Sequence, residues 1–150
     1  MIAGCFVAAG LLAGPASAQE IITAAQPERI EAILKGFGIA RLGTHKTRGD
    51  PQISGRADGK AYEVFFYGCA ENKNCASIQF WTYWSKQVPF EAINAWNAKS
   101  RYGKIYSDAD NDLVLEYDIN LGQGVDERTI ESDAELWMRL VASVESDLAK

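Results

Sequence analysis

The sequence has only one histidine, His45, among its 150 residues. This scarcity excludes any metal site built from several imidazole ligands and leaves a single imidazole as a candidate general base. The sequence also lacks a Gly-x-Ser-x-Gly nucleophile motif, a phosphate-binding loop and a His-Glu-x-x-His zinc motif. We therefore expect a protein that is not an enzyme and that holds no cofactor and no metal.

Basic residues are too few and too scattered to form a patch for polyanions. The 15 Lys and Arg residues stand against 20 Asp and Glu residues, which gives a formal net charge of −5. Nucleic acids and anionic membrane surfaces attract clusters of Lys and Arg, and the sequence contains no such cluster. We expect no nucleic-acid partner.

The first eighteen residues, MIAGCFVAAGLLAGPASA, contain no charged residue. An apolar run ending in Ala16-Ser17-Ala18 is typical of a secretory signal peptide, and it is too short for a comfortable membrane span. We predict a signal peptide over residues 1–18 and a single exported domain over residues 19–150, with no stable membrane insertion after cleavage. An N-terminal helix buried in the fold is the alternative, and the absence of Lys or Arg before the apolar run leaves an upstream start open.

Cys5 lies in a sequence, Ile2-Ala3-Gly4-Cys5, that imitates the cleavage box of a lipoprotein. Lipid attachment requires an apolar segment before the cysteine, whereas here the apolar segment follows it. Lipidation of Cys5 therefore depends on an upstream start.

Signal cleavage leaves two cysteines, Cys69 and Cys75, in an oxidising compartment. The five residues between them match neither the Cys-x-x-Cys of redox enzymes nor ordinary zinc spacing. We predict a structural disulfide that closes a hairpin loop and adds roughly 2 kcal/mol to stability. A redox switch is the alternative.

Helical and strand periodicities alternate along the mature chain. They predict three helices, from Pro27 to Gly36, from Phe90 to about Tyr102, and from Asp126 onward over some six turns. Strands are predicted over residues 39–45 and 52–56, in the two runs of a central hairpin within 60–85, and over 104–107 and 113–121. The order α-β-β-β-β-α-β-β-α indicates an α+β fold, an antiparallel sheet with three helices packed on it.

The aspartates at positions 108, 110 and 112 alternate as at the start of a calcium-binding loop. Leu113 and Ile119 stand where an EF-hand needs Gly and Glu. A solvated hairpin turn is the better interpretation.

The central hairpin has an apolar face and a face that mixes aromatic and polar residues. If Cys69 pairs with Cys75, the register places Tyr67 opposite Ser77, Phe66 opposite Ile78, Phe65 opposite Gln79, Val64 opposite Phe80 and Tyr62 opposite Thr82. Alternation then sorts the side chains onto two faces. The predicted core face carries Tyr62, Val64, Phe66, Ala76, Ile78 and Phe80. The other face carries Glu63, Phe65, Tyr67, Gln79, Trp81 and Tyr83, and we predict it as the candidate interaction face.

Four tryptophans are divided between core and surface by the same patterns. Trp96, with Phe90 and Ile93, lies on the apolar side of the second helix, and Trp137 lies on that of the third, so both are assigned to the core. Trp81 and Trp84 point to opposite sides of their strand, so at least one of them faces away from the core. Trp81 is the candidate interaction residue, because aromatic side chains are enriched in protein interfaces.

Several segments together resemble the YbjN domain family, labelled as a bacterial sensory transduction regulator. They are Phe65-Phe-Tyr-Gly-Cys69, Cys75-Ala-Ser-Ile-Gln-Phe80, Ile93-Asn-Ala-Trp-Asn97, Arg101-Tyr-Gly-Lys-Ile-Tyr106 and Leu115-Glu-Tyr-Asp118. The resemblance runs from about Ala24 to the end of the chain. With its predicted export signal and its cysteines, the chain is similar to the exported proteobacterial branch of the family. It implies a fold like type III secretion chaperones, dimer formation in many members, no enzymatic activity, and a periplasmic or secreted protein of a Gram-negative bacterium. It supplies no functional residues.

Three functional hypotheses follow. The leading one is a non-enzymatic, exported binding or chaperone-like module for protein or peptide partners, with a homodimer as one form. The second is a periplasmic protein that binds a small molecule or an envelope glycan through the same aromatic residues. The third is a hydrolase built on Glu63 and a second carboxylate.

Overall fold

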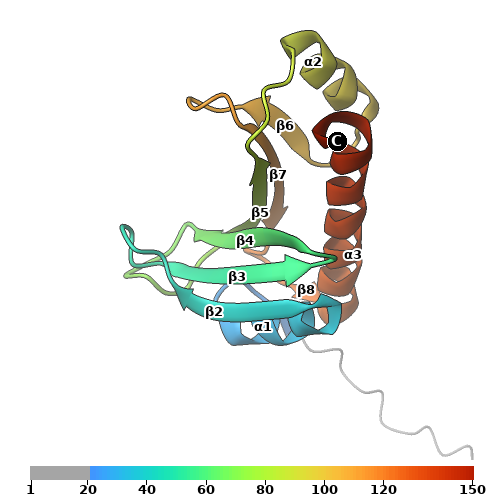
Figure 1. Ribbon diagram of the computed structural model, residues 1–150. Helices are drawn as coiled ribbons and strands as arrows, with labels where there is room; N and C mark the ends of the chain where they lie inside the picture. Colours follow the sequence, from blue (N-terminus) through green and yellow to red (C-terminus); the bar gives the residue numbers. More distant parts are fainter. Residues whose placement is uncertain (1–20) are drawn as a thin grey trace, which may run out of the picture.

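A six-stranded antiparallel sheet with helices on one face forms the body of the computed structural model, which describes residues 21–150 (Figure 1). The strands lie in the order β2-β3-β4-β5-β7-β6, and β1 pairs with β8 in a separate two-stranded sheet. The helices are α1 (Pro27–Leu34), α2 (Phe90–Lys99) and α3 (Glu127–Val144), with a 3-10 turn at Lys35–Phe37 and a π-helical end at Glu145–Ala149. The strands are β1 (Ile21–Ile22), β2 (Ile39–Thr44), β3 (Pro51–Ala57), β4 (Lys60–Tyr67), β5 (Ser77–Trp84), β6 (Lys104–Ser107), β7 (Leu113–Asn120) and β8 (Val125–Asp126).

The predicted α+β class and the order α-β-β-β-β-α-β-β-α are confirmed, with β1 and β8 as additions. The predicted signal peptide, residues 1–18, and Cys5 lie outside the described residues. Within residues 21–150, no helix combines the length and the apolar character needed to cross a membrane.

Local sequence signals explain where the helices begin and end. Pro27 lies in the first turn of α1, where its missing N–H removes no intrahelical hydrogen bond. Asp126 caps α3, because its carboxylate accepts a hydrogen bond from a backbone N–H three residues later at 2.8 Å. α2 ends at Lys99, before the predicted end near Tyr102, because Ser100 already has an extended backbone (φ −80°, ψ 121°).

The hydrophobic core lies between the sheet and helices α1 and α3. Trp137 of α3 is fully buried together with Phe66 and Phe80 of the central hairpin. The ring centres of Phe80 and Trp137 are 5.4 Å apart. Trp96 of α2 is also buried, so both tryptophans predicted for the core lie in it.

Two residues predicted for the core are exposed instead. Phe90 is 69 % exposed, because it is the first residue of α2 and only the side that carries Ile93 and Trp96 packs inward. Ala76 is exposed, because it lies in the turn before β5, where its backbone N–H bonds to Tyr67.

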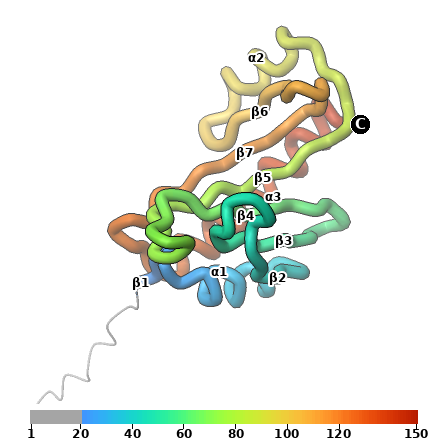
Figure 2. The backbone as a smooth tube through the Cα atoms, turned by 90° about the vertical axis from the view of Figure 1, so that its left-hand side faces the viewer, coloured from blue at the N-terminus to red at the C-terminus, as the bar shows by residue number. Residues whose placement is uncertain are grey.

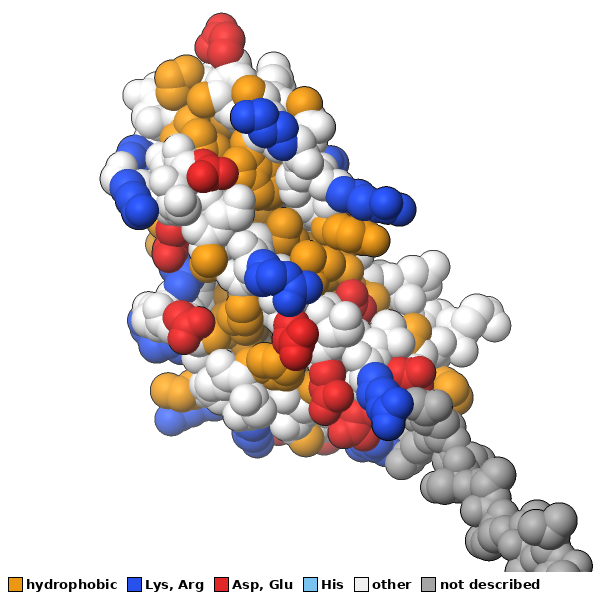
Figure 3. Space-filling view, turned by 90° about the vertical axis from the view of Figure 1, so that its right-hand side faces the viewer, with side chains coloured by type: hydrophobic (Ala, Val, Ile, Leu, Met, Phe, Trp, Pro, Cys, Tyr) orange, Lys and Arg blue, Asp and Glu red, His pale blue; other side chains and the backbone are white. Residues whose placement is uncertain are grey.

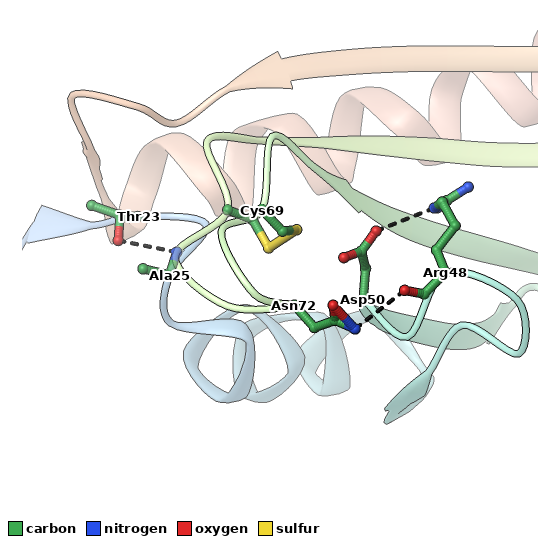
Figure 4. Close-up of a disulfide and its surroundings, with 7 residues drawn as sticks. Thr23, Ala25, Arg48, Asp50, Cys69 and Asn72 are labelled. Carbon is green, nitrogen blue, oxygen red and sulfur yellow. Dashed lines mark hydrogen bonds and ion pairs between the residues drawn. A yellow bond between two sulfur atoms is a disulfide. The ribbon is translucent and has the colours of Figure 1, made fainter.

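The predicted register of the central hairpin is confirmed from Tyr67–Ser77 to Val64–Phe80, whereas strand pairing ends at Glu63–Trp81 and does not reach the predicted pair of Tyr62 with Thr82. Val64 pairs with Phe80 and Phe66 pairs with Ile78, and all four side chains are buried. A disulfide joins Cys69 to Cys75 in the loop between β4 and β5 (Figure 4).

The two sides of the sheet differ. Figure 2 views the molecule with the sheet in front and α3 behind it, and α1 lies along the β2 end of the sheet. Figure 3 views the opposite side, on which α3 lies, where acidic and basic side chains are scattered among hydrophobic ones. No helix within residues 21–150 covers the front of the sheet in Figure 2.

Candidate interaction face

The side of the six-stranded sheet that points away from α1 and α3 carries all six residues predicted for the interaction face. We call this side the open face. Strand alternation and the register place on it, among others, Arg41, Gln52, Ser54, Arg56, Glu63, Phe65, Tyr67, Gln79, Trp81, Tyr83, Lys104, Tyr106, Val114, Glu116 and Asp118. The prediction that these six side chains share one side of the hairpin is therefore confirmed, and their role in binding stays a prediction.

The aromatic rings of the open face form a continuous chain. The ring of Phe65 lies 5.8 Å from that of His45 and 6.1 Å from that of Trp81, in edge-to-face contacts. Trp81 in turn lies 5.3 Å from Tyr83. Tyr83 is 45 % exposed, whereas Phe65 and Trp81 are half-buried by their neighbours. The result is a strip of partly exposed rings that crosses the two central strands.

Carboxylates beside this strip are held by neutral donors. Glu63 accepts hydrogen bonds from the side chains of Gln52 and Ser54, each at 2.7 Å. Asp118 accepts one from Gln79 at 3.1 Å. Among the described residues neither carboxylate forms an ion pair, so both keep their negative charge available at the surface.

Tyr106 holds a third carboxylate in the same way. Its hydroxyl donates to Glu116 at 2.7 Å. Burial raises the pKa of Tyr106 to about 12, and the hydrogen bond to Glu116 acts in the same direction. The phenol therefore remains a hydrogen-bond donor throughout the neutral pH range.

Arg48, in the loop between β2 and β3, covers one end of the open face. Its guanidinium lies 5.0 Å from the ring centre of Tyr67 and 5.7 Å from that of Phe65, within the range of cation–π contacts. An ion pair with Asp50 at 3.2 Å orients it (Figure 4). Burial raises the pKa of Tyr67, and the positive charge of Arg48 opposes that change. Sequence reasoning missed Arg48, because nothing in its spacing shows that this loop folds over β4.

The disulfide loop fixes the position of this loop. The side-chain amide of Asn72 donates to the main-chain oxygen of Arg48 at 3.2 Å (Figure 4). Gly49 has a left-handed backbone (φ +80°), and a Cβ atom there would lie 2.1 Å from the Asn72 amide nitrogen. The loop that carries the disulfide therefore packs directly against the loop that carries Arg48.

The aspartate-rich turn before β7 has the conformation expected of a solvated hairpin turn. The carboxylate of Asp108 accepts hydrogen bonds from the backbone N–H groups of Asp110 and Asp112, at 3.0 and 2.9 Å. Nowhere in residues 21–150 do His, Cys, Asp and Glu side chains gather in a group that could hold a metal ion.

The family comparison agrees with the resemblance noted in the sequence. The family model of YbjN, described as "Putative bacterial sensory transduction regulator", matches residues 26–148. The chain belongs to the YbjN family. No curated protein matches it significantly.

The YbjN family is described by a regulatory role and not by a reaction. Glu63, the carboxylate on which the hydrolase hypothesis rests, lies on the open face. The cross-strand neighbours of Glu63 are Ser54 and Trp81, and Glu116 lies on the same face one strand further on, opposite Trp81, at about two strand spacings (~10 Å) from Glu63. The paired-carboxylate hypothesis therefore stays a prediction.

Two residues of the Ile93–Asn97 motif, which carries part of the likeness to YbjN, have clear structural roles. The indole N–H of Trp96 donates to the Ser143 hydroxyl at 3.3 Å, which fixes α2 against α3. The amide of Asn97 donates to the main-chain oxygen of Ile105 at 2.8 Å and accepts from its N–H at 2.9 Å. Because β6 is an edge strand, this pairing occupies the backbone groups to which another strand would bond.

On the opposite edge of the YbjN sheet, a contact from a helix occupies one backbone N–H of β2. Glu31 of α1 accepts a hydrogen bond from the backbone N–H of Leu42, in edge strand β2, at 3.0 Å. That hydrogen bond and an ion pair with Lys35 hold the pKa of Glu31 below its ordinary value. Sequence reasoning missed both edge contacts, since each depends on how a helix lies against a strand distant in the sequence.

Proposed function

We propose that this YbjN-family chain is a non-enzymatic, chaperone-like binding module that acts as a regulator by docking a protein or peptide partner on its open face. One observation carries the proposal: a six-stranded sheet face without a covering helix in residues 21–150 bears a continuous strip of partly exposed aromatic rings. Aromatic side chains bury much area at low entropic cost and dominate protein interfaces.

Side-chain contacts on both edge strands favour docking on the face over strand addition. Asn97 occupies the backbone of Ile105 on β6, and Glu31 occupies the N–H of Leu42 on β2. A peptide added to either edge has to displace these contacts first. A partner that docks on the open face does not have to displace any of these contacts.

The disulfide supports a location outside the cytoplasm. Cys69–Cys75 is a bond that the reducing cytoplasm disfavours, so the periplasm or the exterior of the cell is the proposed compartment. There the module acts on exported protein or peptide partners, and a second copy of the chain is one of them.

A glycan is the second candidate ligand of the same face. Planar amides and carboxylates, those of Gln52, Gln79, Glu63 and Asp118, flank the rings of Phe65 and Trp81. Side chains of these types hydrogen-bond to sugar hydroxyls while rings stack on sugar faces. The open, sheet-like form of the surface suits an extended chain and not an enclosed monosaccharide.

The test is affinity capture from periplasmic extract with a double variant, Phe65→Ala with Trp81→Ala. The matched control is Phe90→Ala, which removes an exposed aromatic ring on α2, away from the open face. We expect the double variant to lose captured proteins that the wild type and the control both retain. Sedimentation velocity on the same three proteins shows whether the captured partner is a second copy.

Unchanged capture by a folded double variant overturns the proposal. If the double variant loses binding to envelope polysaccharide but still captures proteins, the glycan is the better candidate for the ligand of the open face. Near-ultraviolet circular dichroism confirms that each variant retains native tertiary packing.

A further inference from the structure

The sheet splits at one end between its two central strands. β3 and β4 remain paired as far as Lys60, and β5 and β7 remain paired as far as Trp84. Pairing between β4 and β5 ends at Glu63 and Trp81. Beyond that point, the Thr82 hydroxyl donates to the main-chain oxygen of Ala61 at 2.8 Å and bridges the two diverging strands.

A hollow of about 590 Å³ lies in this split. Its volume falls in the range of sites for small organic ligands, roughly 300–1,000 Å³. Four aromatic residues line it: Trp81, Tyr83 and Trp84, and Tyr62, whose side chain is buried in the core. The hollow therefore has walls suited to an apolar body.

The charged residues of the hollow are mainly basic. Lys60, Lys86 and Lys150 line it, against the side-chain carboxylate of Glu63, and the Lys86 ammonium donates a hydrogen bond to the main-chain oxygen of Lys150. This balance contrasts with the chain as a whole, whose formal net charge is −5. A positive hollow in an acidic protein favours an anionic ligand.

Contacts with neighbouring residues hold the side chain of Lys60 in place. Its ammonium lies 4.1 Å from the ring centre of Trp84 and donates to the main-chain oxygen of Tyr83. Burial lowers the pKa of Lys60, and Glu145, which accepts from the Trp84 indole at 3.3 Å, partly opposes the change. An ammonium held against aromatic rings and partly removed from water binds an anion more strongly than one on an open surface.

We propose that the hollow binds a small organic anion with an apolar body, whose charged group contacts Lys60 and Lys86 and whose body packs on Trp84. The ligand class is an amphiphilic carboxylate, with an aliphatic or an aromatic body. Glu63, Trp81 and Tyr83 belong both to the hollow and to the open face. The anion is therefore the input signal that alters partner docking, and this last step alone rests on the proposed function.

Isothermal titration calorimetry on the wild-type protein tests the binding step. Octanoate and 2-naphthoate are the two anionic probes, and they distinguish an aliphatic from an aromatic body. Octanol and octyltrimethylammonium are the neutral and cationic controls. We expect heat and quenching of tryptophan fluorescence with at least one anion, and neither signal with the two controls.

Variants identify the lysines that bind the charged group. Lys60→Met with Lys86→Met keeps the apolar stems and removes both charges, and we expect the Kd for the anion to rise about tenfold or more. Lys60→Arg keeps the charge and is expected to retain binding. Lys99→Met, which removes an exposed charge on α2, is the matched control and leaves the Kd unchanged.

Three results overturn the proposal: no binding of either anion up to its solubility limit, equal binding of octyltrimethylammonium, or an unchanged Kd in the double variant. If Lys60→Met fails to fold, Lys86→Met alone carries the test, because Lys86 does not pack on Trp84. Titration uses no partner, so its outcome is separable from that of the capture experiment. If the anion binds but does not change the capture of partners, the binding site is supported and only its role in regulating partner docking is rejected.

Discussion

The side-chain amide of Asn97 pairs with both backbone polar groups of Ile105, donating at 2.8 Å and accepting at 2.9 Å. One residue of α2 thus completes the hydrogen bonding of an edge strand in the way a neighbouring strand would. Ile105 is buried, so its backbone groups have little access to water as a substitute. The contact joins α2 to the sheet and at the same time protects the edge from another chain.

Asn97→Ala is expected to lower the free energy of unfolding by about 1–3 kcal/mol, because it leaves a partly buried donor and acceptor without partners. It also frees the β6 edge, so we expect the variant to self-associate at concentrations where the wild type stays in one state. Urea unfolding measures the first effect and sedimentation velocity measures the second.

Asn94→Ala is the control for this prediction, since Asn94 is an exposed residue of the same helix. It is expected to change stability by less than about 0.5 kcal/mol. Equal stability of Asn97→Ala and Asn94→Ala means that the paired contact does not hold α2 on the sheet.

Reduction of the Cys69–Cys75 disulfide is expected to cost roughly 2 kcal/mol, because a short loop regains its freedom in the unfolded chain. The double variant Cys69→Ser with Cys75→Ser should show the same urea midpoint as the reduced wild type. The matched control adds reductant to the double variant, which should not respond. A midpoint unaffected by reduction of the wild type contradicts a stabilising role for the bond.

Gly49→Ala tests whether the disulfide loop and the Arg48 loop interlock. Alanine there is strained by the backbone (φ +80°) and its Cβ also meets the Asn72 amide, so we expect a loss of roughly 2–3 kcal/mol. Gly59 has nearly the same backbone (φ +83°) with no atom within 4 Å of a Cβ, so Gly59→Ala is expected to lose only about 1 kcal/mol.

The difference between the two glycine variants isolates the steric contact with Asn72. Repeating Gly49→Ala in an Asn72→Ala background should reduce the loss to that of Gly59→Ala, measured as a double-mutant cycle by urea unfolding. Identical losses for the two glycine variants in the wild-type background argue that the loops are not interlocked.

The hairpin shows how far sequence reasoning reaches. Once Cys69 is paired with Cys75, alternation alone places Val64 opposite Phe80 and separates Phe66 from Phe65, and the structure agrees. Such local rules hold because period-two alternation leaves a strand few choices when one face must be buried. Alternation fails at Ala76, which lies in the turn before β5, and the helical pattern fails at Phe90, where the first turn of α2 reaches beyond the surface that the helix covers.

The features that define the site are of another kind. The contact of Glu31 with Leu42, that of Asn97 with Ile105, and the split beyond Trp81 all depend on where whole elements lie in space. No spacing in the sequence records that arrangement. The six residues predicted for the interaction face were therefore accessible from the sequence, whereas Lys60 and the hollow beside them were not.

The hydrogen bond between Tyr117 and Asp133 gives a pH-dependent prediction. The Tyr117 hydroxyl donates to the Asp133 carboxylate at 2.7 Å. Burial raises the pKa of Asp133 above its ordinary value of 3.8, and the hydrogen bond from Tyr117 opposes that change. Burial also raises the pKa of Tyr117, with Asp133 acting in the same direction, so the phenol stays protonated and keeps donating at neutral pH.

A carboxyl group whose pKa is raised in the folded state adds stability at low pH, and that contribution is lost as pH rises through the folded pKa. Tyr117→Phe removes the one interaction that opposes the rise, so the pKa of Asp133 should increase further. We expect a loss of about 1–2 kcal/mol at pH 7, where the carboxylate is ionised and unpartnered, and a smaller loss below the ordinary value of 3.8.

Urea unfolding of the wild type and Tyr117→Phe at several pH values measures this difference. Asp133→Asn supplies the control, because an amide accepts the hydrogen bond from Tyr117 without titrating. In the Asp133→Asn background, the effect of Tyr117→Phe should be the same at every pH. A loss that grows toward low pH in the wild-type background contradicts the assignment, since it means that the Tyr117 hydroxyl favours the protonated form of Asp133 and raises its pKa.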